Sequence, residues 1–126
     1  MKIFFSHRML QNSETTHLYE QIVSLLGEYG EVLTENSNDG IEPSYIFERD
    51  TDWLREADVV VAEVTTPSLG VGYEIGLAES LEKRILCLYR EQEDSQVSAM
   101  ILGNRNLSIA QYESITDIEN YLVDYF

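Results

Sequence analysis

The chain has 126 residues, of which 44% are apolar and 25% are charged, a balance typical of one globular domain spanning residues 1–126. Its net charge of -15 argues against long nucleic acid as a partner, because lysine and arginine must displace the counterions condensed on phosphates. No apolar run reaches the roughly 20 residues of a membrane-spanning helix, and the N-terminus lacks the small-residue cleavage site of a signal peptide. We therefore expect a cytoplasmic protein that binds no membrane.

Strand and helix patterns alternate through the first half of the chain. The apolar run KIFFS predicts a strand at 2–6. Apolar residues at helical spacing predict a helix at 14–26, which the glycines of GEYG end. EVLTE predicts a second strand at 31–35, and after the loop NSNDGIEP a second helix is expected at 44–57.

The second half continues the same alternation. DVVVAEV, residues 58–64, is the strongest strand pattern in the chain and is typical of a strand buried on both faces. A loop and a helix at 71–81 follow it. The remaining expected elements are a strand at 84–89, a short helix at 97–102, a strand at 107–111 and a closing helix at 116–125.

This order of elements predicts an α/β fold. Strands joined by right-handed helical crossovers form a parallel sheet that is covered on both faces. We therefore expect a doubly wound, flavodoxin-like domain with a five-stranded parallel sheet. Ligands of such sheets bind beyond the carboxyl ends of the strands, where the strand order reverses, and residues 65–74 follow a central strand.

The stretch EVTTPSLGVGYEIG, residues 63–76, has turn chemistry in front of a helix. Its glycine spacing is one residue longer than the dinucleotide-binding fingerprint, so a Rossmann dehydrogenase is not expected. The glycines permit close approach of backbone to a ligand, and Ser68 offers a hydroxyl to a phosphate or sugar. A purely structural turn explains the stretch about as well.

Glu74 is the carboxylate that this stretch delivers to the helix. A helix N-terminus favours ionised carboxylates, and an ionised, positioned glutamate can attack an anomeric carbon or stabilise an oxocarbenium-like transition state. Asp50 or Asp52 in ERDTDWL could supply a second carboxylate as acid or orienting partner. Helix capping by Glu74 and solvent exposure of both aspartates are the structural alternatives.

Metal and thiol chemistry are not expected. His7 and His17 have no cysteine partners at metal-ligand spacing. Cys87, in the apolar stretch ILCLY, is typical of a buried thiol in a strand. We predict no metal.

The stretches ERDTDWLREADVVVAEVTTPSLGVGYEIG, KRILCLYR and VSAMI resemble the 2'-deoxynucleoside 5'-phosphate N-hydrolases, within the wider nucleoside 2-deoxyribosyltransferase group. The resemblance extends to LYEQIVSLL, YGEVLTE and the closing YF. It implies a flavodoxin-like fold without metal or cofactor. The implied reaction is hydrolysis of the bond between base and deoxyribose in a deoxynucleoside monophosphate.

The resemblance also implies roles for single residues. Glu74 matches the nucleophile, which forms a covalent deoxyribosyl intermediate, and Asp50 matches its partner carboxylate. Ser68 and Gly70 match the loop that holds the 5'-phosphate. Ser98 matches a serine that the neighbouring subunit supplies to the phosphate site, so a homodimer is implied.

The N-terminal segment departs from the family pattern Tyr-Phe-x-Gly-Ser-Ile-Arg-Gly-Gly. Phe4 replaces a catalytic-site tyrosine, His7 replaces a glycine, Arg8 replaces a serine and Leu10 replaces an arginine. Arg8 is a candidate to take over part of the phosphate contact. Further on, Leu77 stands where a family arginine is common. Two alternatives therefore accompany hydrolysis: deoxyribosyl transfer between bases, and nucleotide binding with impaired catalysis.

Overall fold

Five short strands rich in β-branched and aromatic residues form one parallel sheet in the computed structural model, which describes residues 1–9, 12–91 and 96–126. The strands are β1 (Lys2–Ser6), β2 (Glu31–Leu33), β3 (Val59–Glu63), β4 (Arg84–Tyr89) and β5 (Ser108–Gln111). Their order is β2-β1-β3-β4-β5, and every neighbouring pair is parallel. The predicted doubly wound α/β fold is confirmed.

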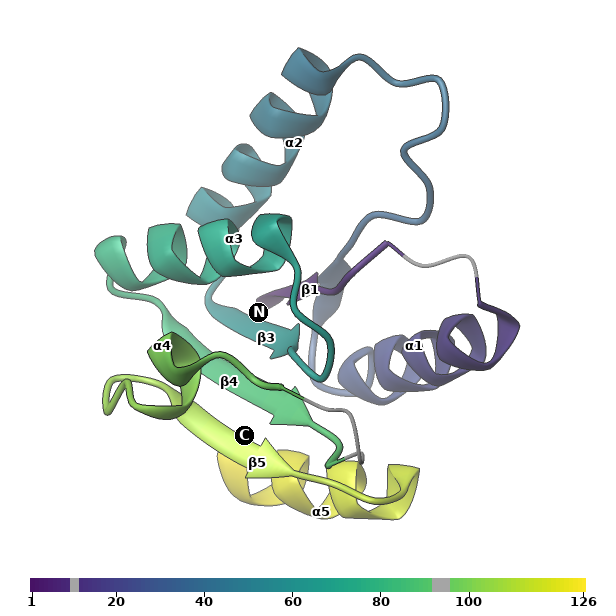
Figure 1. Cartoon of the computed structure of the whole chain (residues 1–126), viewed down its shortest axis with the longest axis vertical. Coiled ribbons are helices and arrows are strands. Elements are labelled where there is room, and N and C mark those ends of the chain that lie inside the picture. Colours follow the sequence, from purple (N-terminus) through teal and green to yellow (C-terminus); the bar gives the residue numbers. More distant parts are fainter. Residues whose placement is uncertain (10–11, 92–95) are drawn as a thin grey trace.

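Helices cover both faces of this sheet (Figure 1). They are α1 (Ser13–Leu26), α2 (Pro43–Glu56), α3 (Leu69–Ser80), α4 (Ala99–Leu102) and α5 (Ile115–Tyr125). Ile22 of α1 and Ile118 of α5 belong to the apolar core on one face. Leu54 of α2 and Ile75 of α3 belong to the core on the other. Among the described residues, no helix combines the length and apolar character needed to cross a bilayer.

The predicted element bounds differ from the observed ones by a few residues at most. The largest differences are two residues, at the starts of α3 and α4 and at the end of the strand expected to reach Glu35, which ends at Leu33. Beyond it, the Thr34 hydroxyl donates to the Phe5 carbonyl at 2.9 Å. This contact holds the end of β2 beside β1, and Glu35 follows in the loop that leaves the sheet.

Strand β1 sends alternate side chains to the two faces. Ile3 and Phe5 join the core under α1 and α5, whereas Phe4 joins the core under α2 and α3. Successive side chains of a strand point to opposite faces, so Ser6 shares the face of Phe4. The last residue of β1 is thereby aimed at the helices that carry Asp50 and Glu74.

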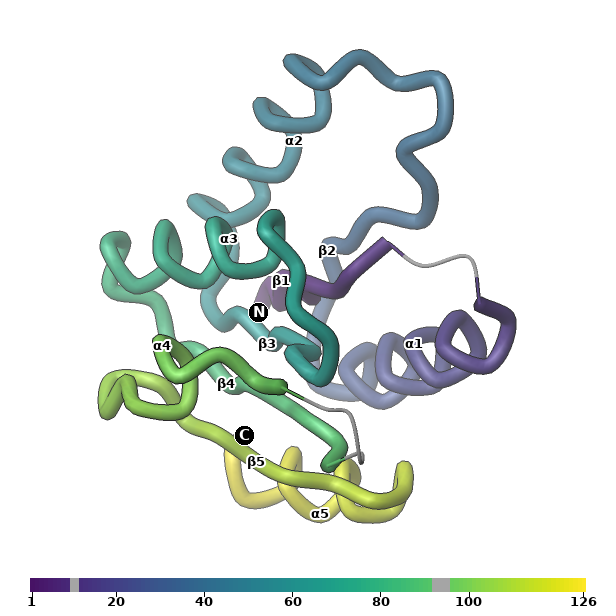
Figure 2. The backbone as a smooth tube through the Cα atoms, in the orientation of Figure 1, coloured from purple at the N-terminus to yellow at the C-terminus, as the bar shows by residue number. Residues whose placement is uncertain are grey.

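The strand order reverses between β1 and β3, because β2 lies on one side of β1 and the remaining strands lie on the other. The carboxyl ends of β1 and β3 lie side by side there, and so do the segments that follow these two strands. The backbone between β2 and α2 swings away from the sheet before α2 returns to it (Figure 2).

A buried carboxylate braces the turn after β3. Glu63 accepts hydrogen bonds from the Thr65 backbone N–H and hydroxyl, both at 2.8 Å, and from the Tyr112 hydroxyl. Glu63 is buried, and these three hydrogen bonds satisfy its carboxylate oxygens. The brace orients the stretch that leads to Ser68 and α3.

Candidate active site

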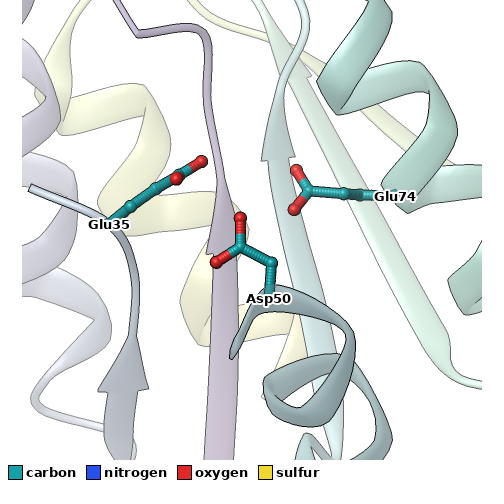
Figure 3. A group of neighbouring side chains, drawn as sticks. All are labelled: Glu35, Asp50 and Glu74. Carbon is teal, nitrogen blue, oxygen red and sulfur yellow. The ribbon is translucent and has the colours of Figure 1, made fainter. Parts of the chain in front are cut away.

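Three carboxylates from separate elements converge at the point where the strand order reverses. Glu35 follows β2, Asp50 lies on α2 and Glu74 lies on α3, and their side chains point toward one another (Figure 3). One oxygen from each carboxylate lies within 4.8 Å of the others. Ser6 at the end of β1 donates its hydroxyl to Oε1 of Glu74 at 2.9 Å. The predicted pair, Glu74 and Asp50, is therefore close enough to act on neighbouring atoms of one substrate.

One guanidinium ties two of these carboxylates together. Arg49 Nε donates to Oδ1 of Asp50 and Nη2 donates to Oε2 of Glu35, both at 2.9 Å. The same Nη2 contacts Oδ1 of Asn38 at 3.0 Å. The guanidinium carbon lies 4.9 Å from the centre of the Trp53 ring, within the range of a cation–π contact.

Burial controls the charge of the cluster. The pKa of Glu74 is raised to about 8, mainly by burial; the hydrogen bond from Ser6 opposes the rise, and the nearby carboxylates of Asp50 and Glu35 add to it. Burial likewise raises the pKa of Asp50, against the opposing contact with Arg49. Desolvation and like charges both disfavour the ionised form of a carboxyl group, so the free site retains a proton at neutral pH.

The expectation that the helix N-terminus keeps Glu74 ionised is wrong for the free site. Helix α3 begins at Leu69 and Ser68 is its N-cap, so Glu74 lies in the second turn. The favourable field of a helix end fades within the first turn. The side chain is instead buried between α3 and the sheet, where desolvation dominates.

A cavity of about 500 Å³ opens beside the cluster. Asp50, Glu74, Ser68, Gly70 and Arg8 all line it, and these include five of the seven residues that the sequence marked for catalysis or substrate binding. Much of the remaining wall is apolar or aromatic and comprises Met9, Pro43, Ile46, Phe47, Val71 and Tyr73. A cavity of this size with a few convergent polar groups suits a small organic ligand.

The N-terminus of α3 forms one side of this cavity. The Ser68 hydroxyl accepts from the Val71 N–H at 3.4 Å and caps the helix. A Cβ atom added at Gly70 would meet only the Ser68 hydroxyl, at 4.0 Å, so a side chain there would enter the space in front of the cap. Helix N-termini attract anions through their unpaired N–H groups. The predicted phosphate contact of Ser68 and Gly70 stays a prediction that suits this geometry.

Two other residues marked for substrate binding lie outside the cavity lining. Phe4 is 1% exposed, and its ring lies 6.3 Å from that of Trp53. Ser98 caps α4 by accepting from the Met100 N–H at 3.1 Å. It lines a second cavity, of about 650 Å³, which Ser68 and Tyr73 share with the first. Leu10, noted as replacing a family arginine, lies outside the described residues.

Sequence reasoning missed Ser6, Glu35 and Arg49. The alternation in β1 puts Ser6 on the face of Phe4, and Glu35 follows a strand at the edge where ligands bind. The positions of Ser6 and Glu35 could therefore be predicted from the sequence, but the residues that they contact could not. Arg49 gave no signal of its own, because arginine next to aspartate on a helix is ordinary surface composition.

The carboxylate cluster is also the place where a hard cation would find oxygen ligands. Arg49 already contacts two of its three members, and its charge would oppose that of a metal ion. The prediction that the protein uses no metal stays a prediction.

Ser6→Ala is expected to raise the pKa of Glu74 above its wild-type value, because the hydroxyl stabilises the ionised carboxylate. The unfolding free energy should fall by about 1 to 2 kcal/mol at alkaline pH, where Glu74 is ionised. Carboxyl ¹³C NMR titration measures the first effect and urea denaturation the second. Ser80→Ala, which removes an exposed hydroxyl bonded to the Leu77 carbonyl of the same helix, is the control. An unchanged Glu74 titration in Ser6→Ala would contradict the assignment.

Comparison with known proteins identifies relatives over nearly the whole chain. The family model for nucleoside 2-deoxyribosyltransferase matches residues 3–118. A Nematostella vectensis protein provisionally named 2'-deoxynucleoside 5'-phosphate N-hydrolase 1 is 41% identical, over 99% of this chain and 93% of its own length. The 5-hydroxymethyl-dUMP N-hydrolase of Mus musculus is 50% identical over 80% of this chain, a match that spans 64% of the mouse protein.

A solved structure shows the same fold. The CMP N-glycosidase of Clostridium botulinum superposes with a TM-score of 0.79 at 22% identity and covers 100% of both chains. At this identity the likeness concerns the fold. The family model and the sequence relatives confirm the resemblance predicted from the stretch around Glu74.

Proposed function

The chain belongs to the nucleoside 2-deoxyribosyltransferase family, and we propose that it hydrolyses the N-glycosidic bond of 2'-deoxynucleoside 5'-monophosphates to free base and deoxyribose 5-phosphate. The observation that carries this proposal is the Glu74–Asp50 carboxylate pair beside the cavity, with oxygens within 4.8 Å. Retaining glycosidases use a nucleophile and an acid at about this separation. The N-hydrolase names of the relatives support the same reaction class.

The proposed reaction begins with Glu74 as nucleophile. Ser6 holds Oε1, so we assign Oε2 to the attack on the anomeric carbon. The new C–O bond forms as the C–N bond breaks, and the electron pair of the C–N bond leaves with the base. Asp50 donates a proton to the base, and water later attacks the anomeric carbon, returning a proton to Asp50 and releasing Glu74.

The proton retained by the cluster suits this scheme. The free site keeps a proton because burial raises the pKa values of Glu74 and Asp50. Transfer of that proton from Glu74 to Asp50 would ionise the nucleophile and arm the acid in one step. Two carboxyl groups whose environments compete for a proton are a common source of such paired roles.

We assign the 5'-phosphate to the part of the cavity beside the N-terminus of α3. Ser68 and Gly70 at the start of α3 offer N–H groups and open space there, and Arg8 lines the same cavity. A phosphate can be held by a helix N-terminus with little side-chain charge. This arrangement explains how a chain of net charge -15 would accept an anionic substrate.

A base-release assay tests the proposal. Purified protein is incubated with a panel of deoxynucleosides, each with and without a 5'-phosphate and including 5-hydroxymethyl-dUMP, the substrate in the mouse relative's name. Free base is measured by chromatography. Release by wild type and its loss in Glu74→Ala supports the proposal. Equal background in both proteins for every substrate refutes it.

Deoxyribosyl transfer is the second candidate, because it would use the same covalent intermediate with a base in place of water as acceptor. The family match favours keeping it in view. Adding an acceptor base to the assay separates the two reactions. A new nucleoside identifies a transferase, whereas free sugar phosphate alone identifies a hydrolase.

Nucleotide binding without turnover is the third candidate. The observation behind it is Phe4, which replaces a family tyrosine and whose ring lies in the core against Trp53. A ligand that binds only the folded state raises apparent stability. This candidate predicts a higher Tm with deoxynucleotides and no base release.

We also propose a homodimer in which Ser98 serves the site of the partner subunit. The second cavity, which Ser98 lines, extends along α3 from its N-cap Ser68 to Glu79. Leu69 is 96% exposed and Met100 is 83% exposed at its rim. Gly72 and Gly76 leave the helix surface open. Exposed apolar residues around a groove mark interaction surfaces.

Mixing two inactive variants tests the shared site. If Ser98 acts across the interface, Glu74→Gln and Ser98→Ala subunits should complement, because a mixed dimer contains one site without either substitution. An equal mixture, after subunit exchange, is then expected to regain about a quarter of wild-type activity. Base release measures the recovery, and sedimentation confirms the dimer. A mixture no more active than the two variants alone contradicts the shared site.

A further inference from the structure

We propose that Arg49 is a positioning residue that ties Asp50 to Glu35 and sets the pH range in which Asp50 and Glu74 work. It is one cation against three carboxylates, and its side chain is 17% exposed. The inference rests on the proposed glycosidase function for its catalytic consequence. The arrangement itself stands on the contacts of Arg49.

The shape of the guanidinium matters as much as its charge. Nε donates to Asp50 and Nη2 donates to Glu35, each at 2.9 Å, so one planar group bridges carboxylates from α2 and from the end of β2. Lysine carries a point charge without this fork. Arg49 therefore fixes the direction of the Asp50 carboxylate as well as its electrostatic environment.

Arg49 is itself held from behind. Its guanidinium packs over Trp53 at 4.9 Å, and Trp53 lies against Phe4 in the core between the sheet and α2. The series Phe4, Trp53, Arg49 and Asp50 leads from the core to the cavity. A guanidinium packed on an aromatic ring samples few other positions, and this gives Asp50 a fixed partner.

The charged and titratable groups around Asp50 come from several elements. Glu35 after β2 and Glu74 on α3 add negative charge, and Arg49 on α2 opposes them. His7, after β1, contacts the Glu35 carbonyl through Nε2 at 3.2 Å, and Arg8 lines the cavity. Of these groups, Arg49 contacts both Asp50 and Glu35 directly. Its removal should therefore change the titration of Asp50 more than any other change of a neighbouring cation.

Arg49→Gln tests this role. The limb of the pH profile of kcat/KM that reports ionisation of the carboxylates is expected to move to higher pH by about 1 to 3 units, the usual influence of an adjacent arginine on a carboxyl group. Arg49→Lys should recover part of the shift, because the charge remains but the fork is lost. Arg55→Gln is the matched control, since Arg55 lies on the same helix and pairs with Asp52 on the surface.

A second readout does not require turnover. Carboxyl ¹³C NMR, with Asp50 assigned through Asp50→Asn, follows its titration in wild type and in the Arg49→Gln, Arg49→Lys and Arg55→Gln proteins. An upward shift confined to the Arg49 variants supports the inference. Equal Asp50 titrations in Arg49→Gln and Arg55→Gln overturn the inference. If Arg49→Gln does not fold, the inference is overturned when Asp50 titrates in Arg49→Lys as it does in wild type. Absence of base release from wild type refutes the proposed glycosidase, while the NMR result still decides the role of Arg49.

Discussion

Glu74→Gln is expected to reduce base release by roughly 10³-fold or more, because an amide cannot form the covalent bond to the anomeric carbon. The change keeps the shape of the side chain and one oxygen that can accept the hydrogen bond from the Ser6 hydroxyl. In the wild-type protein this hydroxyl lies 2.9 Å from Oε1 of Glu74. KM should change little, since the carboxylate is assigned to the chemical step more than to binding. Steady-state kinetics with the best substrate of the panel measures both parameters.

Glu48→Gln is the control for this substitution. Glu48 is an exposed glutamate on α2, two residues before Asp50, so its replacement makes the same chemical change near the site without entering it. Wild-type turnover is expected. If Glu74→Gln retains activity within a few-fold of Glu48→Gln, Glu74 is not the nucleophile, even when the protein is a glycosidase.

The stability of the protein should depend on Glu74 in the direction opposite to an ordinary carboxylate. Its pKa is about 8 in the folded protein against a usual value of 4.5, so folding favours the protonated form. The contribution of protonated Glu74 to the unfolding free energy is complete below about pH 4.5 and is lost as pH rises through about 8. The unfolding free energy of wild type should therefore fall relative to that of Glu74→Gln across this window, by on the order of a few kcal/mol.

Urea denaturation at about pH 5 and about pH 9 measures this difference. At the lower pH the two proteins should have similar unfolding free energies, since a protonated glutamate and a glutamine are both neutral. At the higher pH the variant should be the more stable. Glu48→Gln corrects for the rest of the titration curve. A constant difference between wild type and Glu74→Gln at both pH values would mean that Glu74 is ionised throughout.

The fold was predictable because its signals are local and repeated. The apolar run before Glu63 requires a strand buried on both faces, and helical spacing flanks it on each side. Only a few connections of such elements form a covered parallel sheet. The element bounds differed by at most two residues, at two helix starts and at the end of β2, where Thr34 donates to the Phe5 carbonyl.

The fold class, the family and the stretch that carries Glu74 were predictable from the order of residues alone, because each depends on periodicity or on a contiguous run of residues. Only the tertiary structure brought Ser6, Glu35 and Arg49 to Asp50 and Glu74, and it placed Phe4 behind Trp53 and outside the cavity lining. These residues come from β1, α2, α3 and the loop after β2, and no local pattern encodes the distances between them. The protonation of Glu74 also follows from burial at their meeting point, which exists only after the helices pack on the sheet.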